Sequence, residues 1–242
     1  MTEAGIDAKI PVIDAVLTYA VDTGEKIVNE TMGEGDMGRK RTGVVEEKTM
    51  PMQDGRRLRD TFDLEIHGFE FVDHPTAMKD FFDPVELKSV YYKEVEELVK
   101  ARTGAKRVHV FDHTLRSGDE DTRNEKLVRE PVARVHNDYT EWSGPNRVRD
   151  LLPGEAEDLL TRRFAIVQVW RAIRNPIGIC DARSLAPEDL VISERRYPDR
   201  IGQTYQIAYN ANHEWYYFPR MARDEAMVFK VFDSATDGRA RF

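Results

Sequence analysis

The sequence predicts a mainly β fold with flanking helices, arranged as a sandwich or a barrel. Three observations support this prediction. Apolar segments with the period of a strand recur at close spacing in the second half of the chain. Proline and glycine turns separate these segments, and only one or two segments have the period of an amphipathic helix. A long helix followed by a mostly β second half also argues against the alternating order of a Rossmann fold.

The strand pattern is clearest after residue 105. It predicts strands over 106–111, 164–173, 204–210, 215–218 and 227–233. The segment 164–173 is apolar on both faces over most of its length, as in a strand that is covered on both sides. Residues 1–60 carry scattered glycines and charges, so we expect short strands and long loops that wrap a core built elsewhere. We expect a single domain over residues 1–242.

One long helix has both a beginning and an end in the sequence. Asp83 is a good N-cap, Pro84 suits the first turn, and Glu86 has the spacing of a capping box. Apolar residues follow at steps of three and four, and Gly104 is a natural C-terminal stop. A weaker helix is predicted over 154–163.

The composition excludes several classes of protein. The chain has 44 acidic and 36 basic residues, a formal net charge of −8, which argues against a nucleic-acid binder and a polybasic membrane-surface protein. No apolar stretch is long enough to span a membrane, and the N-terminus lacks the basic region of a signal peptide. Cys180 is the only cysteine, which excludes an intrachain disulfide and a cysteine-rich zinc site. We expect a cytoplasmic protein.

Three possible motifs have simpler explanations. Residues 33–38 match G-x-G-x-x-G, but Gly43 and Pro51 follow where a helix is needed, so a flexible loop is predicted. His109 and His113 would share one face of a strand, either as a pocket wall or as hydrogen-bonded residues near the core. Cys180 has no histidine beside it in sequence and is predicted to be a small buried apolar residue.

The strongest candidate site is the pair His136 and Asp138. An H-x-D pattern places an imidazole and a carboxylate on the same side of an extended strand. Two of the three ligands of a 2-His-1-carboxylate facial triad are often supplied in this way, although the spacing alone also arises by chance. The only later histidine is His213, which is either the third ligand or a packed residue. Arg171 and Arg174 follow an apolar strand and could bind a carboxylate ligand or pair with acidic residues.

Seven segments, in order, resemble a known family. They begin at Gly68-Phe-Glu-Phe-Val-Asp-His-Pro-Thr and continue at 91–94, 110–116, 135–140, 170–177, 212–221 and 229–234. Together they resemble the cephem-methoxylase-related hydroxylase/desaturase family of bacterial and fungal secondary metabolism, over residues 60–242. The resemblance implies a double-stranded β-helix (jelly-roll) core and an oxygenase that uses Fe(II), 2-oxoglutarate as co-substrate and O₂. His136 and Asp138 match the iron ligands of the family's H-x-D motif.

The resemblance also contains a departure from the family pattern. The family's distal histidine, and an arginine that binds 2-oxoglutarate, lie beyond the equivalent of Phe242. We therefore expect a C-terminally shortened chain whose jelly roll lacks its last strand or strands, with His213 as a substitute ligand being the other interpretation. The predicted function is hydroxylation or desaturation of a small secondary metabolite, without nucleic acid or membrane. The alternatives are a non-catalytic jelly-roll small-molecule binding protein and a methyl-transfer component of a methoxylation system.

Overall fold

The computed structural model describes residues 10–31, 39–116, 134–171, 177–198 and 200–242. Three sheets make up most of the described structure, and each combines strands from distant parts of the chain. The first has the order β1 (Val12–Val21), β4 (Val44–Asp54), β11 (Trp215–Tyr217), β8 (Gly178–Cys180). The second has the order β3 (Arg39–Arg41), β2 (Ile27–Thr31), β9 (Leu190–Arg196), β10 (Ile201–Ile207), β6 (His136–Asn137). The third has the order β5 (Phe69–Asp73), β12 (Glu225–Asp233), β7 (Ala165–Trp170).

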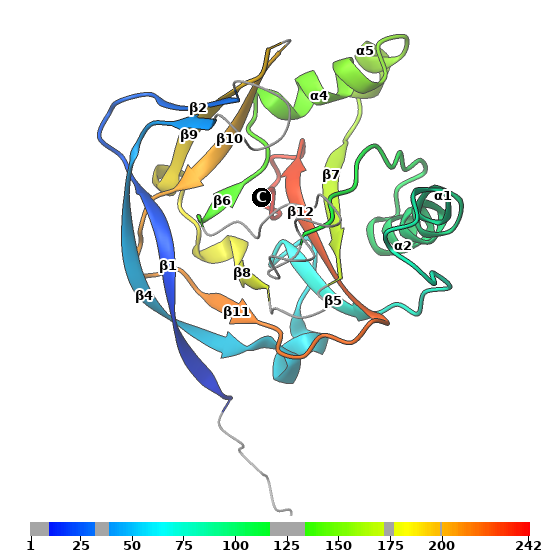
Figure 1. Ribbon diagram of the computed structural model, residues 1–242, viewed down its shortest axis with the longest axis horizontal. Coiled ribbons are helices and arrows are strands. Elements are labelled where there is room, and N and C mark those ends of the chain that lie inside the picture. The colour runs from blue at the N-terminus through cyan, green and yellow to red at the C-terminus, as the bar shows by residue number, and fades with distance from the viewer. Residues whose placement is uncertain (1–9, 32–38, 117–133, 172–176, 199) are drawn as a thin grey trace, which may run out of the picture.

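The third sheet faces the second across the interior of the molecule (Figure 1). Phe242, the last residue of the sequence, lies between them: its ring centroid is 5.3 Å from that of Tyr205 on β10 and 6.3 Å from that of Phe232 on β12. Helices cover the outside. The described helices are α1 (Pro84–Glu86), α2 (Tyr92–Thr103), α4 (Ser143–Leu151) and α5 (Ala156–Leu160). The predicted mainly β fold with flanking helices is therefore confirmed.

The N-terminal segment supplies strands to two of the sheets. β1 and β4 pair antiparallel over ten consecutive positions, from Val12 opposite Gln53 to Val21 opposite Val44. β4 then pairs parallel with β11, and β2 pairs parallel with β9. β1 and β4 are 10 and 11 residues long, so the expectation of only short strands in this segment is wrong. The scattered polar residues of this segment obscure the alternation typical of a strand, so the sequence does not predict strands of this length. Pairing across ten positions nevertheless stabilises them.

The long predicted helix is confirmed at both ends. The Asp83 carboxylate accepts hydrogen bonds from the backbone N–H of Val85 and that of Glu86, at 2.8 and 3.2 Å. Gly104 ends the helix with a φ of 68°, which only glycine adopts without strain. A π-type turn at Leu87–Tyr91 separates α1 from α2, which the sequence pattern does not predict.

Two local predictions near this helix are wrong. Glu86 does not complete a capping box, because its carboxylate accepts the backbone N–H groups of Lys79 and Asp80 instead. Residues 106–111 form no strand, since this segment finds no ladder partner among the described residues. Side chains hold it in place: Arg107 forms a bidentate ion pair with Glu155, at 2.8 Å for both bonds. Alternation predicts an extended segment but not its pairing partner.

The other predicted elements are present, with shifted ends. Strands β7, β10, β11 and β12 correspond to the predictions over 164–173, 204–210, 215–218 and 227–233. Helix α5 occupies the middle of the predicted helix 154–163. β12 is the centre of the third sheet and is almost entirely buried, which fits the apolar residues that make up most of its sequence.

The largest aromatic cluster of the core lies under β5 and β11. Phe62, Phe69 and Phe218 pack there with ring centroids 4.6 to 6.3 Å apart. Gly55 allows this packing, because a Cβ atom on it would lie 2.5 Å from the ring of Phe218. The 3₁₀ turn Gly55–Thr61 is thereby held close against the core.

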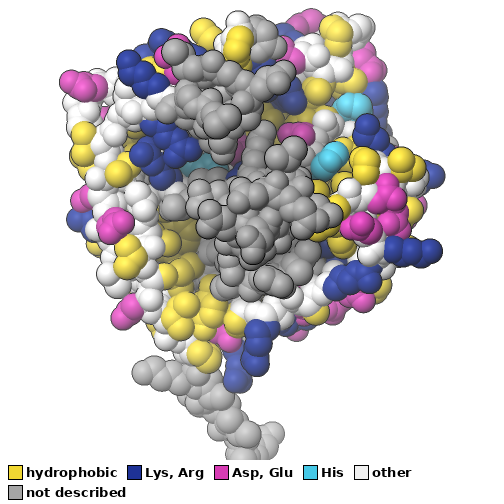
Figure 2. All heavy atoms as spheres, viewed as in Figure 1, with side chains coloured by type: hydrophobic (Ala, Val, Ile, Leu, Met, Phe, Trp, Pro, Cys, Tyr) yellow, Lys and Arg dark blue, Asp and Glu magenta, His cyan; other side chains and the backbone are white. Residues whose placement is uncertain are grey.

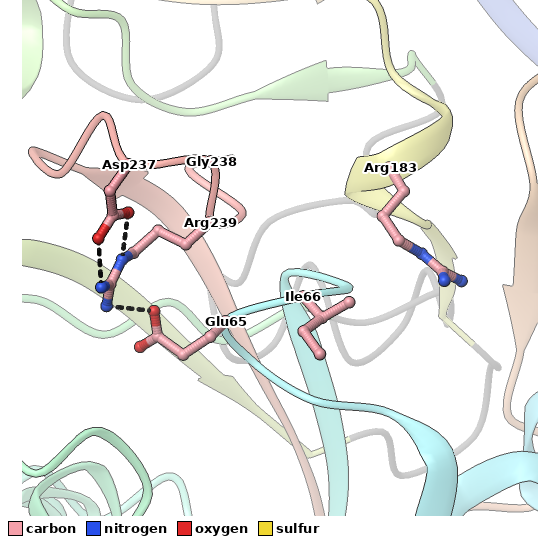
Figure 3. Close-up of a pocket in the computed structure, with 6 residues that line it drawn as sticks. All are labelled: Glu65, Ile66, Arg183, Asp237, Gly238 and Arg239. Carbon is pink, nitrogen blue, oxygen red and sulfur yellow. Dashed lines mark hydrogen bonds and ion pairs between the residues drawn. The ribbon is translucent and has the colours of Figure 1, made fainter.

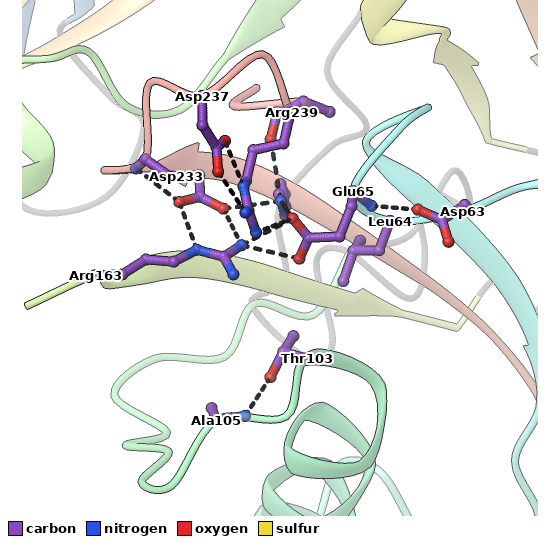
Figure 4. A network of polar contacts seen from close by, with 12 residues as sticks. Asp63, Leu64, Glu65, Thr103, Ala105, Arg163, Asp233, Asp237 and Arg239 are labelled. Atoms are coloured by element: carbon purple, nitrogen blue, oxygen red, sulfur yellow. Dashed lines mark hydrogen bonds and ion pairs between the residues drawn. The ribbon is translucent and has the colours of Figure 1, made fainter.

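A network of charged side chains ties the residues after β12 to the rest of the molecule (Figure 4). The ammonium group of Lys230 is fully buried and lies 2.8 Å from Asp233 and 3.0 Å from Glu65. Arg163, just before β7, contacts both of these carboxylates, and Arg239 contacts Glu65. Each buried charge thus has opposite charges beside it, as burial requires.

Candidate active site

His136 lies on the short strand β6, whose partner is β10. The ladder places His136 opposite Gln206 and fixes the backbone of this segment at the interior edge of the second sheet. The ring Nδ1 lies 2.8 Å from the backbone carbonyl of Arg134, and because a carbonyl only accepts, Nδ1–H is the donor. The other ring nitrogen, Nε2, is therefore left with its lone pair free to bind a cation.

Asp138 lies on the same side of the extended segment as His136, as the H-x-D spacing predicts. The Oδ1 atom of Asp138 lies 3.5 Å from Nε2 of His136, with side-chain exposures of 33% and 23%. Asn137, between them, points the other way, and its Nδ2 donates to the carbonyl of Val231 on β12 at 2.8 Å. This buried tether fixes the segment against the third sheet. The structure therefore brings the two predicted residues together.

The carboxylate of Asp138 is held in its ionised form. Burial by itself raises the pKa of this group, but burial is outweighed by the hydrogen bond and charge that the imidazole of His136 supplies when it is protonated, by the charge of Arg195 and by a hydrogen bond from Gln168. The result is a pKa of about 2, below the usual value of 3.8. At neutral pH the site thus presents an anionic oxygen beside an imidazole nitrogen.

These two atoms suit a divalent cation. Two acceptor atoms that face one another repel unless a proton or a cation lies between them. Donors about 2.1 Å from one ion, at the right angle of an octahedral site, lie about 3 Å apart. The observed 3.5 Å is close to this spacing. Among the residues that the structure describes, no group of three or more His, Cys, Asp or Glu side chains could hold a metal ion, so the pair has no third side chain of these types beside it there.

The helix after the pair, α4, was missed by the sequence analysis. Thr140 and Ser143 form reciprocal hydrogen bonds: the N–H of Thr140 donates to Oγ of Ser143 at 2.8 Å, and the N–H of Ser143 donates to Oγ1 of Thr140 at 3.1 Å. This reciprocal geometry is similar to that of a capping box, although the residue directly before α4, Trp142, makes no side-chain capping bond, so the Thr-x-x-Ser spacing was the available signal. The turn starts two residues after Asp138 and restricts the movement of its backbone.

His213 is not a substitute ligand. It is buried, its Nε2 lies 3.0 Å from Oδ2 of Asp189, and its Nδ1 lies 3.3 Å from the hydroxyl of Tyr19. The ring also stacks on Tyr19, whose hydroxyl accepts the indole N–H of Trp215 at 2.8 Å. Both ring nitrogens therefore have partners in the core, and the interpretation of His213 as a packed residue is correct.

The other sequence candidates take structural roles or lie outside the described residues. His109 and His113 are exposed, and His113 contacts the hydroxyl of Tyr92 at 2.7 Å, so they are not a hydrogen-bonded pair near the core. The guanidinium of Arg171 donates to the carbonyls of His74 and Arg223, and it forms no ion pair with an acid among the residues that the structure describes. Residues 33–38 and Arg174 lie outside the described residues.

Cys180 is half-buried at the end of β8 and packs beside the cluster that contains Tyr19 and Trp215. Burial raises the pKa of its thiol to about 12, so the thiol is protonated at neutral pH. The prediction of a small buried apolar residue agrees with this packing, although Cys180 is half-buried and not fully buried.

A surface hollow of about 470 Å³ lies elsewhere, next to the charged network (Figure 3). Arg183 lies on one side of it, and Arg239 lies on the other. Arg183 is paired with Asp181, while Arg239 is paired with Asp237 and Glu65. Because these guanidinium groups already bind carboxylates, the hollow has no free charge with which to select a ligand.

The sequence analysis also missed Gln168, which contacts Asp138 directly. Its Nε2 lies 2.5 Å from Oδ2 of Asp138. Gln168 is the only polar residue of β7, whose sequence is Ala-Ile-Val-Gln-Val-Trp. A single amide inside an apolar strand requires a hydrogen-bond partner, and this was the available signal.

Comparisons with known proteins identify the family. A family model described as an oxidoreductase/YMDC permease-like domain matches residues 17–242. A hydroxylase/desaturase of Cercospora beticola, CTB9, is 32% identical over 257 residues, which cover 96% of this chain and 79% of the relative. The chain belongs to the hydroxylase/desaturase family of oxidoreductases. The resemblance noted in the sequence is confirmed.

Other members of this hydroxylase/desaturase family carry more specific names. The alpha-ketoglutarate-dependent dioxygenase phiK of a fungal species is 32% identical over 238 residues, which cover 94% of this chain and 84% of the relative. A solved structure, the iron and alpha-ketoglutarate-dependent endoperoxidase NvfI, superimposes with a TM-score of 0.81 at 24% identity, covering 95% of this chain and 87% of that chain. This likeness shows that the two proteins share a fold, in agreement with the predicted jelly roll.

The surface of this hydroxylase/desaturase-family protein agrees with its composition. Acidic and basic side chains are interspersed over the described part of the face that Figure 2 shows. In the parts of the chain that the structure describes, no helix has the length and apolar character needed to cross a membrane.

Proposed function

We propose that this protein is an Fe(II)- and 2-oxoglutarate-dependent oxygenase that hydroxylates or desaturates a small secondary metabolite, with His136 and Asp138 as two of its iron ligands. One observation carries the proposal: Nε2 of His136 and Oδ1 of Asp138 face one another at 3.5 Å in a chain whose relatives include alpha-ketoglutarate-dependent dioxygenases. An imidazole and a carboxylate are the ligand types of the facial iron triad.

The residues of this chain would prepare the site before any ligand binds. The carbonyl of Arg134 holds the imidazole of His136 in the tautomer that directs a lone pair at the ion. The lowered pKa keeps Asp138 ionised, so no proton has to leave this carboxylate before a metal binds. The tether from Asn137 to β12 and the turn at Thr140 hold the segment between the two ligands rigid.

The bound iron and 2-oxoglutarate would supply the oxidising chemistry, and the protein would supply the position of the substrate. In hydroxylation, one atom of O₂ enters the substrate C–H bond and the other enters succinate, as 2-oxoglutarate loses CO₂. In desaturation, two hydrogen atoms leave the substrate and one oxygen atom leaves as water. In either case 2-oxoglutarate is consumed and succinate is formed, which gives a readout that does not require the substrate class to be known in detail.

The test begins without oxygen. Fe(II) and 2-oxoglutarate are added to the full chain, and the weak visible charge-transfer band of the ternary complex is recorded before O₂ is admitted and succinate is measured. We expect both signals. Asp138→Ala should abolish both, because an anionic ligand is lost. The matched control is His113→Gln, which removes an exposed imidazole that contacts Tyr92, and it should leave both signals intact.

The non-catalytic binding protein remains the alternative to be excluded by the same experiment. A pair of ligands without a third is expected to hold iron weakly. If the full chain forms no charge-transfer band, makes no succinate and retains no iron on desalting, the oxygenase proposal is wrong and the binding function is favoured.

A further inference from the structure

Two side chains of β7 continue the polar contacts of the candidate site into the third sheet. Gln168 and Trp170 lie two residues apart, so both point to the same face of the strand. Val167 and Val169 point to the other face, where they pack with Leu98 of α2. The packed valines fix the strand, and the fixed strand directs the amide and the indole toward the interior.

The contacts between these groups have only one consistent direction. The indole Nε1–H of Trp170 lies 2.5 Å from Oε1 of Gln168, and an indole nitrogen can only donate. The amide oxygen of Gln168 must therefore face Trp170, which turns its NH₂ group toward Asp138. That group donates to Oδ2 of Asp138 at 2.5 Å. Trp170 in this way fixes the orientation of the amide. Without Trp170, the oxygen and the NH₂ group of Gln168 could exchange places.

The result is a carboxylate whose two oxygens differ. Oδ2 of Asp138 accepts the hydrogen bond from Gln168, while Oδ1 faces the free nitrogen of His136. A hydrogen bond to one oxygen fixes the rotation of the carboxylate and leaves the other oxygen for the ion. Gln168 is neutral, so it supplies this bond without adding a positive charge that would repel a cation.

We propose that Gln168, oriented by Trp170, is a positioning residue that holds Asp138 as a ligand through Oδ1 alone. This inference rests on the proposed function, because it assumes that His136 and Asp138 bind a divalent metal. It adds two residues of a distant strand to the site, and neither of them touches the metal ion.

The experiment measures metal binding instead of turnover. Co(II) is titrated into the full chain without oxygen, and its visible absorption bands report both the affinity and the ligand geometry. Gln168→Met keeps the length of the side chain but removes the donor, and we expect about 10- to 100-fold weaker binding with shifted bands. The matched control is Gln53→Met, at a half-buried glutamine of β4 in the first sheet, which should bind Co(II) as the wild type does.

Trp170→Phe tests the orienting role, since it keeps a ring and removes only the N–H. We expect weaker Co(II) binding than in the wild type, by a smaller factor than in Gln168→Met. In the Gln168→Met background, Trp170→Phe should have no further effect, because the indole acts through the amide. Trp170→Phe also serves as the test if Gln168→Met fails to fold, as judged by circular dichroism.

Each outcome has one meaning. If the wild type binds no Co(II), the proposed function fails and this inference fails with it. If the wild type binds Co(II) and Gln168→Met binds it equally well with unchanged bands, the positioning role alone is wrong. If Trp170→Phe weakens binding by the same factor in both backgrounds, the two residues act independently and the orienting role is wrong.

Discussion

Replacing two histidines by alanine should separate a structural role from a ligand role. His213 is buried and has a partner at each ring nitrogen, whereas the side chain of His136 is 23% exposed and directs a free nitrogen at Asp138. His213→Ala should therefore lower the stability of the protein without directly changing the metal site. His136→Ala should change the metal site directly and leave the stability of the protein nearly unchanged.

The magnitude follows from what His213 leaves behind. Its removal opens a cavity and takes a hydrogen-bond partner from the buried carboxylate of Asp189, which keeps its bonds to Asn210 and to the N–H of Ala186. A lost bond to a buried charged group together with a cavity costs about 3 kcal/mol. For a chain of this length, that corresponds to a fall in melting temperature of roughly 6–12 °C.

The assay combines thermal unfolding with Co(II) titration for both variants. We expect His213→Ala to melt several degrees lower and to bind Co(II) normally at a temperature where it is folded. His136→Ala should lose Co(II) binding while its free energy of unfolding changes by no more than about 1 kcal/mol. If His213→Ala instead keeps the wild-type melting temperature and loses Co(II) binding, the assignment of His213 to the core is wrong.

Three further predictions concern the thiol, the charged network and acid stability. Cys180, with a thiol pKa raised to about 12 by burial, should react with a disulfide reagent at pH 8 at least about 10-fold more slowly in the native protein than in guanidinium chloride; equal rates would contradict the burial. Lys230→Met should cost about 3 kcal/mol in urea unfolding, because Asp233 and Glu65 lose a buried partner; a change below about 0.5 kcal/mol would show that the network contributes little. Asp138 has a folded-state pKa of about 2, below its usual value, so its ionised form contributes stability above about pH 4 that is lost as the pH falls toward 2. The difference in unfolding free energy between wild type and Asp138→Asn, no more than about 2 kcal/mol at pH 5, should shrink at pH 3, and a constant difference would contradict the lowered pKa.

The accuracy of the sequence predictions depended on the range of the interaction involved. The helix ends at Asp83 and Gly104 were predictable, because a cap and a left-handed glycine act within a few residues. The prediction of a strand over 106–111 was wrong, because a strand also needs a hydrogen-bonded neighbouring strand, and the sequence of the segment does not specify one. The capping box at Glu86 failed for the same reason, since its carboxylate finds the N–H groups of Lys79 and Asp80.

The candidate site shows the same division. The sequence by itself determined that His136 and Asp138 lie on one side of an extended segment, because side chains two residues apart share a face of any strand. Only the tertiary structure decided that His213 belongs to the core and that Gln168, thirty residues along the chain, reaches Asp138. Contacts of this kind depend on how the sheets face one another, and that arrangement is set by the packing of the whole core instead of by any local pattern.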